Sequence, residues 1–580
     1  MVSILLVGEG NFSFSASLCD TGEDAHHITA TCYEAEDTVR QQHLSWRNVQ
    51  HLRSKGAEVH FGVDVTKLDE YGFITNQSYD RIIFNFPHCG RKAGVKKNRD
   101  LLSNFFNSCT CVLSAKGEIH VALCQGQGGT PADQSKREWH NSWQVVAMAA
   151  TAGFILTSVV PFESDKHYGY QSTGYRSQEK SFHVIGALNH VFTRSLPLEN
   201  LSALQIIEKL TSVQEPKCID DEVDGGFLGK TSLHPIGVIY KELVKCFHQK
   251  LQVNVLEDTF PLICRNDACS SRPPYLASHS KLYTVTAGTE KEGSEISDDL
   301  HTTHLCSVEA AHPDNNRTAG LHHLRPTLTC FISDISHKSN CRPNSLTVVS
   351  GLVFRKCLIS PQSMPIYHEM LMLLDCREQL QLVMDTMSTV MASIISMETV
   401  SSEKITFHLE KDYIVTMSPA NPDWMIGTIK EVPAGGQPKT FIVSLNLDLL
   451  AMCLLRIEDW RLLWTEDDRF GAQFHHRDLK PHQTFSLYPP YYIHDVSFWV
   501  EENAAFDDVE FHTVALQMSK GNIMDIQLLD LYKNTETGRT GLCYRLKYQS
   551  CDRALSYRSA LAMQLQLRDE LPRRLHVVLR

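Results

Sequence analysis

The first residues that could do chemistry are two glycines near the start of the chain. Gly8 and Gly10 enclose Glu9 and precede Asn11, directly after an apolar run with the composition of a buried strand. Glycines at this point let the backbone approach a nucleoside or amino-acid group at a helix N-terminus. The same pair also occurs in ordinary tight turns, so these four residues are a candidate cofactor loop and not yet a signature.

Polar residues end three further apolar runs. Glu34 follows the second run, where Rossmann-like domains bind ribose hydroxyls. Asp64 follows the third run, where it could read an adenine amino group, and Asn85 ends the fourth. Because the carboxyl ends of parallel strands meet at one edge of a sheet, we expect these residues to surround one ligand. The absence of a third glycine favours S-adenosylmethionine over NAD as that ligand.

The elements that must position these residues follow an α/β pattern. From residue 1 to about 195, short apolar runs alternate with helix-length polar segments, which is typical of a doubly wound parallel sheet. Helical spacing covers 37–55 and 99–115. The predicted strands are 3–7, 28–32, 58–63, 79–85, 117–123, 155–161 and 181–187. We therefore predict a Rossmann-like nucleoside-cofactor domain over 1–195.

The turn after the fourth strand contains the candidate catalytic residues. Its sequence resembles the Asn/Asp-Pro-Pro-aromatic turn of nitrogen methyltransferases, in which an amide and a backbone carbonyl orient the target nitrogen. The turn residues are Asn85, Phe86, Pro87 and His88. Five basic residues and no acidic residue follow, namely Arg91, Lys92, Lys96, Lys97 and Arg99. Such a cluster suits a phosphate backbone, although a solvated loop would carry the same charges.

Three N-terminal stretches, 5–15, 61–68 and 80–88, resemble the eukaryotic large-subunit rRNA uridine-N3 methyltransferase family. The resemblance implies a Rossmann-like fold, S-adenosylmethionine as cofactor and rRNA as substrate. It assigns the glycine loop, Glu34 and Asp64 to the cofactor, and Asn85 through His88 to the uracil. The chain departs from the family at 122–126, where Ala-Leu-Cys-Gln-Gly replaces Thr-Leu-Lys-Asp-Gly. A non-catalytic RNA-binding scaffold is therefore the alternative.

The middle of the chain resembles the catalytic domain of phenylalanyl-tRNA synthetase, at 233–235, 351–356 and 365–369. Arg355 keeps the position of the family arginine that holds a nucleotide phosphate. In the next family motif, Gly-x-Gly-x-Glu-Arg, both glycines are replaced and the arginine is Leu449. We therefore expect a degenerate class II synthetase-like domain, built on an antiparallel sheet, that has lost aminoacylation.

The resemblance resumes on both sides of a stretch rich in Ser, Thr, His, Asn and Pro at 265–345. We predict that this stretch is a polar insertion within a synthetase-like domain over 230–470.

The C-terminal part, at 457–470 and 488–499, closely resembles the tail of mitochondrial-type phenylalanyl-tRNA synthetase. This resemblance implies a ferredoxin-fold anticodon-binding domain of βαββαβ order over 487–580, and a tRNA partner. Residues 541–580 contain eight Lys or Arg and three Asp or Glu, a local charge of +5 in a chain of −12. Candidate RNA contacts are Arg545, Lys547, Arg553 and Arg558, interleaved with Tyr544, Tyr548 and Tyr557. Core tyrosines beneath a solvated basic face are the alternative.

Composition limits the remaining possibilities. A length of 580 residues corresponds to roughly three to five domains, and 42% hydrophobic with 21% charged residues is ordinary globular composition. No apolar run reaches the ~18–20 residues of a membrane span, and no signal or transit peptide is recognisable. Cys109 and Cys111 lack a second pair, so we predict no metal. We expect a cytoplasmic or nuclear, including nucleolar, protein of undetermined oligomeric state.

Together these patterns predict a multidomain α/β and α+β chain. It would be an S-adenosylmethionine-dependent RNA methyltransferase, methylating uridine N3 in rRNA or tRNA, with a C-terminal tRNA-binding or RNA-binding module.

Overall fold

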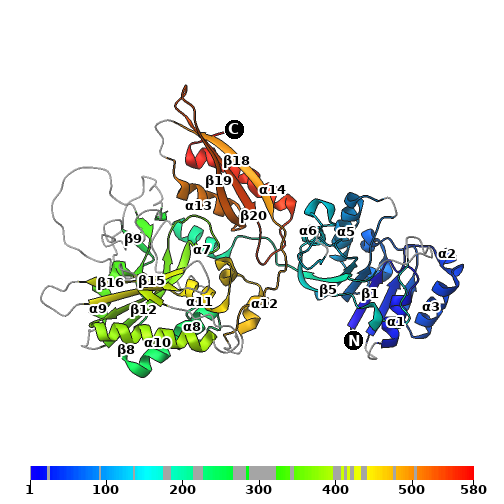
Figure 1. Ribbon diagram of the computed structural model, residues 1–580, viewed down its shortest axis with the longest axis horizontal. Coiled ribbons are helices and arrows are strands. Elements are labelled where there is room, and N and C mark those ends of the chain that lie inside the picture. The colour runs from blue at the N-terminus through cyan, green and yellow to red at the C-terminus, as the bar shows by residue number, and fades with distance from the viewer. Residues whose placement is uncertain are drawn as a thin grey trace, which may run out of the picture.

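The computed structural model describes residues 2–21, 26–90, 93–134, 137–173, 184–212, 226–265, 282–285, 322–339, 345–395, 407–409, 414–417, 424–432, 440–474, 479–501 and 506–580. In these residues the chain forms two seven-stranded sheets, one four-stranded sheet and one three-stranded sheet. Figure 1 shows three units, with the N-terminal unit at one end and the C-terminal unit above the other two. The predicted α/β and α+β fold class is confirmed.

The N-terminal sheet has the order β3-β2-β1-β4-β5-β7-β6, and only β7 runs antiparallel to its neighbours. Its strands are β1 (Val2–Val7), β2 (His26–Thr31), β3 (Glu58–His60), β4 (Tyr79–Asn85), β5 (Leu113–Leu123), β6 (Phe154–Pro161) and β7 (Leu188–Arg194). Ile4 through Val7 are buried as a continuous run, because helices cover both faces of a parallel sheet. Those helices are α1 (Ser13–Thr21), α2 (Glu36–Arg40), α3 (His43–Ser54), α4 (Gly72–Thr75), α5 (Val95–Cys109) and α6 (Val145–Ala150).

Two predicted elements of this unit are wrong. The seventh strand is Leu188–Arg194 and not 181–187, because Gly186 has φ of +71° within a turn and ends the apolar run there. Residues 181–183 lie outside the described part of the chain. The helix predicted over 99–115 begins earlier, at Val95, and ends at Cys109, because β5 already starts at Leu113.

The central sheet has the order β14-β15-β16-β17-β13-β12-β8 and is antiparallel except for the pair β8 and β12. Its strands are β8 (Gln252–Leu256), β12 (Ser345–Phe354), β13 (Ile366–Leu374), β14 (Phe407–Leu409), β15 (Ile414–Met417), β16 (Trp424–Val432) and β17 (Thr440–Asn446). The main helices beside it are α8 (Pro235–Lys250), α10 (Arg377–Ile395) and α11 (Leu447–Leu455). Strands β12 and β13 are buried along their whole length, so this sheet holds the core of the middle unit.

The predicted polar insertion at 265–345 extends too far. Most of it lies outside the described residues, but its last part forms β11 (His322–Leu324) and α9 (Ile332–Lys338). Strand β11 joins β9 (Ile263–Arg265) and β10 (Thr284–Val285) in the three-stranded sheet. Leu328 and Ile335 are fully buried, so this part belongs to the core in spite of its polar composition.

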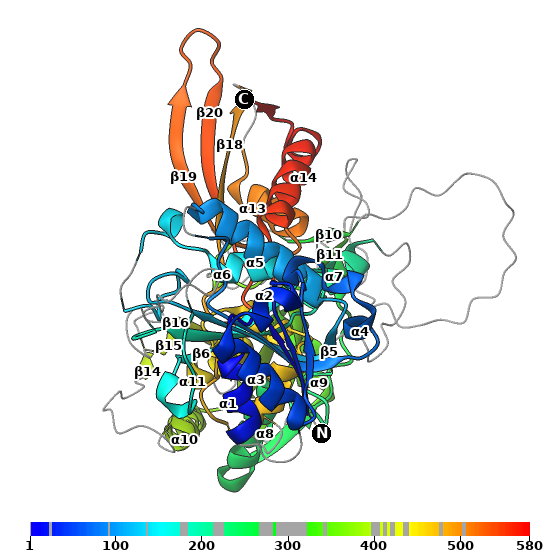
Figure 2. The same ribbon diagram turned by 90° about the vertical axis from the view of Figure 1, so that its right-hand side faces the viewer.

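The C-terminal unit follows the predicted βαββαβ order. Its elements are β18 (Tyr492–Val500), α13 (Asp508–Met518), β19 (Ile523–Lys533), β20 (Thr540–Tyr548), α14 (Tyr557–Leu575) and β21 (Val578–Leu579). The sheet order is β19-β20-β18-β21, and every pairing is antiparallel. In Figure 2 the β19–β20 hairpin extends beyond the two helices.

Direct hydrogen bonds join the N-terminal unit to both other units. Arg469, in α12 (Asp468–Gly471), donates from Nη1 to Thr193 Oγ1 at 2.7 Å and from Nη2 to the Arg194 carbonyl at 3.2 Å. Arg553, after β20, donates to the Pro197 carbonyl at 2.8 Å. These contacts hold the end of β7 and the residues that follow it against the middle and C-terminal units. Among the described helices, none combines the length and apolar character needed to cross a membrane.

Candidate functional site

The turn after β1 is shaped by glycine. Gly8 has φ of +65°, and a Cβ there would lie 2.5 Å from the Phe84 ring, so a larger residue would collide with β4. The Glu9 carboxylate accepts a hydrogen bond from the Ser15 amide at 3.2 Å, in the first turn of α1. Burial raises the pKa of Glu9 to about 7. The Glu9 carboxylate therefore holds the start of the helix, and its pKa lies close to neutral pH.

Gly10 and Asn11 contact a distant segment of the same unit. Asn11 Nδ2 donates to the Gln171 carbonyl at 3.2 Å, and a Cβ on Gly10 would lie 1.9 Å from Thr173 Oγ1. A larger residue at position 10 would therefore have to displace the Thr173 side chain, because the chain at 171–173 packs directly onto Gly10. The sequence pattern assigned this glycine to a cofactor and contained no signal for that packing.

The two predicted acidic residues lie at the ends of β2 and β3. Glu34 accepts from Gln42 Nε2 at 3.2 Å, and its carbonyl accepts from the Gly62 amide at 2.9 Å. Asp64 Oδ1 accepts from the Thr66 amide at 2.9 Å and so caps the 3₁₀ turn η1 (Val65–Glu70). A Cβ on Gly62, which has φ of +68°, would meet nothing within 4 Å. The backbone at Gly62, between the two acidic residues in the sequence, therefore borders open space.

The turn after β4 holds an unpaired amide. Among the described residues, the buried Asn85 Nδ2 has no hydrogen-bond partner, which is unfavourable by about 1–3 kcal/mol and calls for an explanation such as a functional role. Phe86 has φ of +51°, a strained value for a residue with a side chain, and its amide donates to the Ala122 carbonyl at 2.9 Å. Pro87 is buried between these residues and His88.

His88 is held as a neutral ring. Its Nδ1 accepts a hydrogen bond from the Gly90 amide at 3.1 Å, and burial lowers the pKa of His88. A neutral imidazole that accepts at Nδ1 carries its proton on Nε2. His88 in this tautomer is a hydrogen-bond donor at Nε2 and not a base.

Sheet order brings these turns together. β1 lies between β2 and β4, so the glycine turn adjoins Glu34 on one side and Asn85 on the other, while Asp64 follows the next strand outward. All four turns end parallel strands at the same edge. The arrangement has carboxylates for ribose and base groups on one side and a donor amide on the other, which suits a nucleoside cofactor facing a target with carbonyl oxygens.

The basic cluster after the turn divides by environment. Lys96 and Lys97 are exposed in the first turn of α5. Arg99 instead donates to the Ser142 carbonyl at 2.7 Å and to the His140 carbonyl at 2.8 Å, which fastens α5 to the following loop. Arg91 and Lys92 lie outside the described residues.

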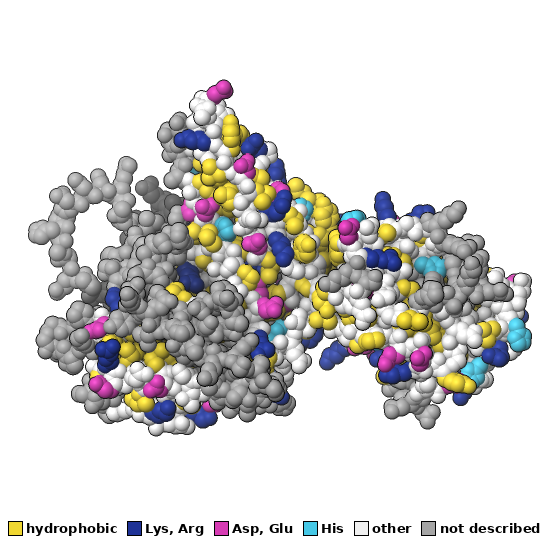
Figure 3. All heavy atoms as spheres, viewed as in Figure 1, with side chains coloured by type: hydrophobic (Ala, Val, Ile, Leu, Met, Phe, Trp, Pro, Cys, Tyr) yellow, Lys and Arg dark blue, Asp and Glu magenta, His cyan; other side chains and the backbone are white. Residues whose placement is uncertain are grey.

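The C-terminal basic residues divide in the same way. Arg558 is exposed, Lys547 lies 5.0 Å from the Tyr491 ring, and Arg545 forms two bonds to Asp495 at 2.9 and 2.8 Å. Arg553 is only 6% exposed and holds the unit junction. On the face shown in Figure 3, the Lys and Arg side chains of this unit are interspersed with Asp and Glu and are not gathered in one stripe.

The tyrosines proposed to stack on bases lie mostly in the core. Tyr544 and Tyr548 are buried, and their hydroxyls donate to Asp508 and Gln564. Tyr557 is 56% exposed. For the first two the predicted stacking role is wrong, because period-two alternation turns them toward the helices and not toward solvent.

The middle unit carries side chains at two positions of the degenerate synthetase motif. Asn446 stands where the family has a glycine, and its Oδ1 accepts from the amide of Leu449 at 3.0 Å, while Leu449, at the position of the family arginine, is buried. Asp448 Oδ2 accepts from the His368 amide at 2.7 Å. Arg355 stacks over the Tyr367 ring at 5.0 Å.

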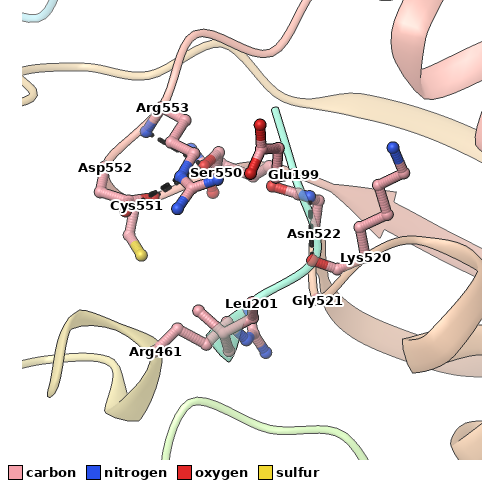
Figure 4. Close-up of a pocket in the computed structure, with 11 residues that line it drawn as sticks. Glu199, Leu201, Arg461, Lys520, Gly521, Asn522, Ser550, Cys551, Asp552 and Arg553 are labelled. Atoms are coloured by element: carbon pink, nitrogen blue, oxygen red, sulfur yellow. Dashed lines mark hydrogen bonds and ion pairs between the residues drawn. The ribbon is translucent and has the colours of Figure 1, made fainter. Parts of the chain in front are cut away.

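A small cavity lies between the C-terminal unit, Arg461 of the middle unit and the segment at 199–201 that follows β7 (Figure 4). Its volume is about 20 Å³, which accommodates about one water molecule and excludes a nucleotide. Arg461, 4% exposed, lines the cavity, and its Nε and Nη2 have no partner among the described residues. The sequence patterns did not single out this arginine.

Comparison with known proteins agrees with this division of the chain. Residues 5–174 match the family described as rRNA (uridine-N3-)-methyltransferase BTM5-like, and residues 486–580 match the ferredoxin-fold anticodon binding domain. The chloroplastic/mitochondrial phenylalanine–tRNA ligase of Arabidopsis thaliana is 35% identical over 24% of this chain and 32% of its own length.

Two mammalian proteins match along the whole length. Ferredoxin-fold anticodon-binding domain-containing protein 1 of Homo sapiens is 39% identical, with 99% of both chains covered, and its Mus musculus homolog has the same identity and coverage. The chain therefore belongs to the family of ferredoxin-fold anticodon-binding domain-containing protein 1, and combines a methyltransferase-like domain with a ferredoxin-fold anticodon-binding domain.

Proposed function

We propose that this protein is an S-adenosylmethionine-dependent RNA methyltransferase that acts on uridine N3. The observation that carries the proposal is the Asn85 amide, which has no partner in the part of the chain that the structure describes and lies at the end of the strand next to the glycine turn. A buried donor without a partner matches a target that has carbonyl oxygens on both sides of the reacting nitrogen. The family similarity of residues 5–174 supports the same base.

The residues fit the cofactor. Glu34 would hold the ribose hydroxyls, Asp64 the adenine amino group, and the turn containing Gly8 the amino-acid end. When bound, S-adenosylmethionine supplies a methyl group on a positively charged sulfur, which a nitrogen lone pair takes up as the carbon–sulfur bond electrons stay on sulfur.

The protein's own groups would act on the uracil. The N3 nitrogen has to lose its proton before its lone pair can attack, and the negative charge then spreads onto the two carbonyl oxygens. The Asn85 amide would donate to one of these oxygens and so favour the deprotonated form. His88 with its proton on Nε2 would donate in the same way and cannot accept the N3 proton there. We propose that the proton leaves to solvent.

The C-terminal unit would bind RNA through its exposed basic residues. Lys547 and Arg558 are the strongest candidates, while Arg545 would have to exchange Asp495 for a phosphate. The relatives with a similar tail are phenylalanine–tRNA ligases, which favours tRNA as a ligand of this unit. The rRNA-directed family of the N-terminal unit favours rRNA as the methylated molecule.

Cofactor binding is the first test. Calorimetry of the full-length protein with S-adenosylmethionine should show binding that Glu34→Ala weakens at least about tenfold, because hydrogen bonds to a charged group contribute about 1.5–3 kcal/mol. Glu36→Ala is the matched control, since Glu36 lies two residues away and, among the described residues, forms its ion pairs with the exposed arginines Arg40 and Arg53. Absence of binding at millimolar ligand would favour the scaffold alternative.

The second test concerns the base. Asn85→Ala should retain cofactor affinity and lose methyl transfer. Cross-linking in cells with sequencing of the bound RNA would identify the substrate, and mass spectrometry after depletion should show less 3-methyluridine in it. Unchanged modification of both rRNA and tRNA would overturn the methyltransferase proposal.

A further inference from the structure

A segment after β6 crosses the candidate methyl-transfer site. Residues 162–173, here called the strap, begin at the edge strand β6 and reach the glycine turn of β1, which lies four strands away in the sheet. The Phe162 amide donates to the Ala187 carbonyl at 2.9 Å at one end of the strap. At the other end the Gln171 amide donates to Ser13 Oγ at 2.9 Å. The strap therefore passes over the carboxyl ends of the strands between them.

Aromatic rings of the strap cover the turn that holds Asn85. The ring centroids of Phe162 and Phe86 lie 5.0 Å apart, and those of Phe162 and Tyr170 lie 5.8 Å apart. Tyr170 also packs edge-on against Phe14 of α1 at 5.6 Å. Asn85 is the last residue of β4, and the next residue, Phe86, has its ring packed against the Phe162 ring of the strap.

We propose that the strap restricts the substrate to a single unpaired base, and that Phe162 and Tyr170 are the residues that hold its ring. This inference rests on the proposed function and specifies its substrate class. A base inside a duplex has its N3 edge hydrogen-bonded to the opposite strand and stacked on both sides, so it cannot pass beneath the strap. An extruded base takes over ring contacts that Phe162 now makes with Phe86, and its stacking offsets the loss of its neighbours.

The strap also links the base to the cofactor loop. Asn11 and Ser13, on either side of Phe12, both bond to the Gln171 carbonyl at 3.2 Å. Thr173 lies against Gly10. An outward shift of the strap therefore disturbs the glycine turn, so base and cofactor bind interdependently.

The strap offers its own matched variants. Tyr168 is 92% exposed, two residues from Tyr170, which packs against Phe14. With full-length protein and total RNA from depleted cells, Tyr170→Ala and Phe162→Ala should each lower kcat/KM for RNA roughly tenfold, since stacking on one base contributes about 1–3 kcal/mol. Tyr168→Ala should not change it, and Tyr170→Phe should restore most of the loss.

Two readouts distinguish selection of the base from simple misfolding. RNA containing 4-thiouridine should photocross-link to a peptide that includes the strap, and a complementary oligonucleotide annealed over the modified site should abolish methylation. Two outcomes would overturn the strap proposal if cofactor binding and methyl transfer are still observed. One is equal methylation of the paired and the unpaired target, and the other is equal effects of Tyr168→Ala and Tyr170→Ala. Absence of cofactor binding would instead overturn the proposed function beneath it.

Discussion

Burial changes the protonation of single side chains in the N-terminal unit, and Glu9 is affected within the physiological pH range. Its carboxyl group accepts a hydrogen bond from the Ser15 amide in the glycine turn, and burial raises its pKa from 4.5 to about 7. The folded protein therefore binds this proton more tightly than the unfolded chain does. Stability is lost as the pH rises from 4.5 toward 7, and the whole penalty is present above pH 7.

Glu9→Gln should remove this penalty. The amide oxygen still accepts from Ser15 but carries no charge, so the variant should be more stable than wild type at pH 8 by on the order of 2 kcal/mol. The difference should shrink below pH 7 and vanish near pH 4.5. Thermal unfolding of both proteins between pH 5 and 8 measures it, and a difference that stays constant over this range would contradict the assignment.

At the scale of elements, helix α5 separates two kinds of basic residue. Arg99 binds carbonyl groups of the loop at 140–142, while Lys97 is exposed. Arg99→Ala should therefore lower the free energy of unfolding by roughly 1–2 kcal/mol, and with it the unfolding temperature. The salt dependence of RNA binding should stay unchanged. Lys97→Ala should do the reverse and reduce the slope of log K against log salt by about one. Binding titrations at several salt concentrations, together with melting curves, check both variants. A reduced slope in the Arg99 variant alone would contradict the assignment of Arg99 to structure and of Lys97 to RNA binding.

The elements themselves were largely predictable from the sequence. The first six N-terminal strands follow from local apolar periodicity, which depends on nearby residues only. The βαββαβ order of the tail was implied by its resemblance to the phenylalanyl-tRNA synthetase tail. The strap was not predicted, because it has no periodicity, and its only signal is a loop that contains several aromatic residues. Arg553 and Tyr544 were placed in an RNA contact because residue type does not show whether a side chain faces a neighbouring unit or solvent.

The site shows the same limit. Glu34, Asp64 and Asn85 could be assigned to one edge because strand order in a doubly wound sheet follows general rules. The packing role of Gly10 could not be predicted, because Thr173, which packs onto it, belongs to a segment more than 160 residues later in the chain.

At the scale of the whole molecule, the contacts between units determine whether the two units proposed to bind RNA move independently. A flexible tether only raises the effective concentration of one site near the other. Here Arg469 pairs with Asp467 through two nitrogens, at 2.8 and 2.6 Å, and from that fixed position bonds to Thr193 and Arg194. An arginine held in this way restrains the N-terminal unit against the middle unit, and Arg553 adds a hydrogen bond from the C-terminal unit to the Pro197 carbonyl. We therefore expect the proposed methyl-transfer edge and the C-terminal sheet to keep a narrow range of separations. A substrate RNA that contacts both would then place its modified base within a narrow range of distances from the segment bound by the tail.

Arg469→Ala should release this constraint. Small-angle scattering should show a larger radius of gyration than wild type, because the two bonds to the N-terminal unit are lost, while cofactor affinity stays within about twofold. Methylation of a long RNA that spans both units should fall, and methylation of a short fragment containing only the target base should not. Arg456→Ala is the control, since Arg456 is an exposed arginine of the same unit. An unchanged radius of gyration, or equal losses with long and short RNA, would show that the units are spaced by other contacts.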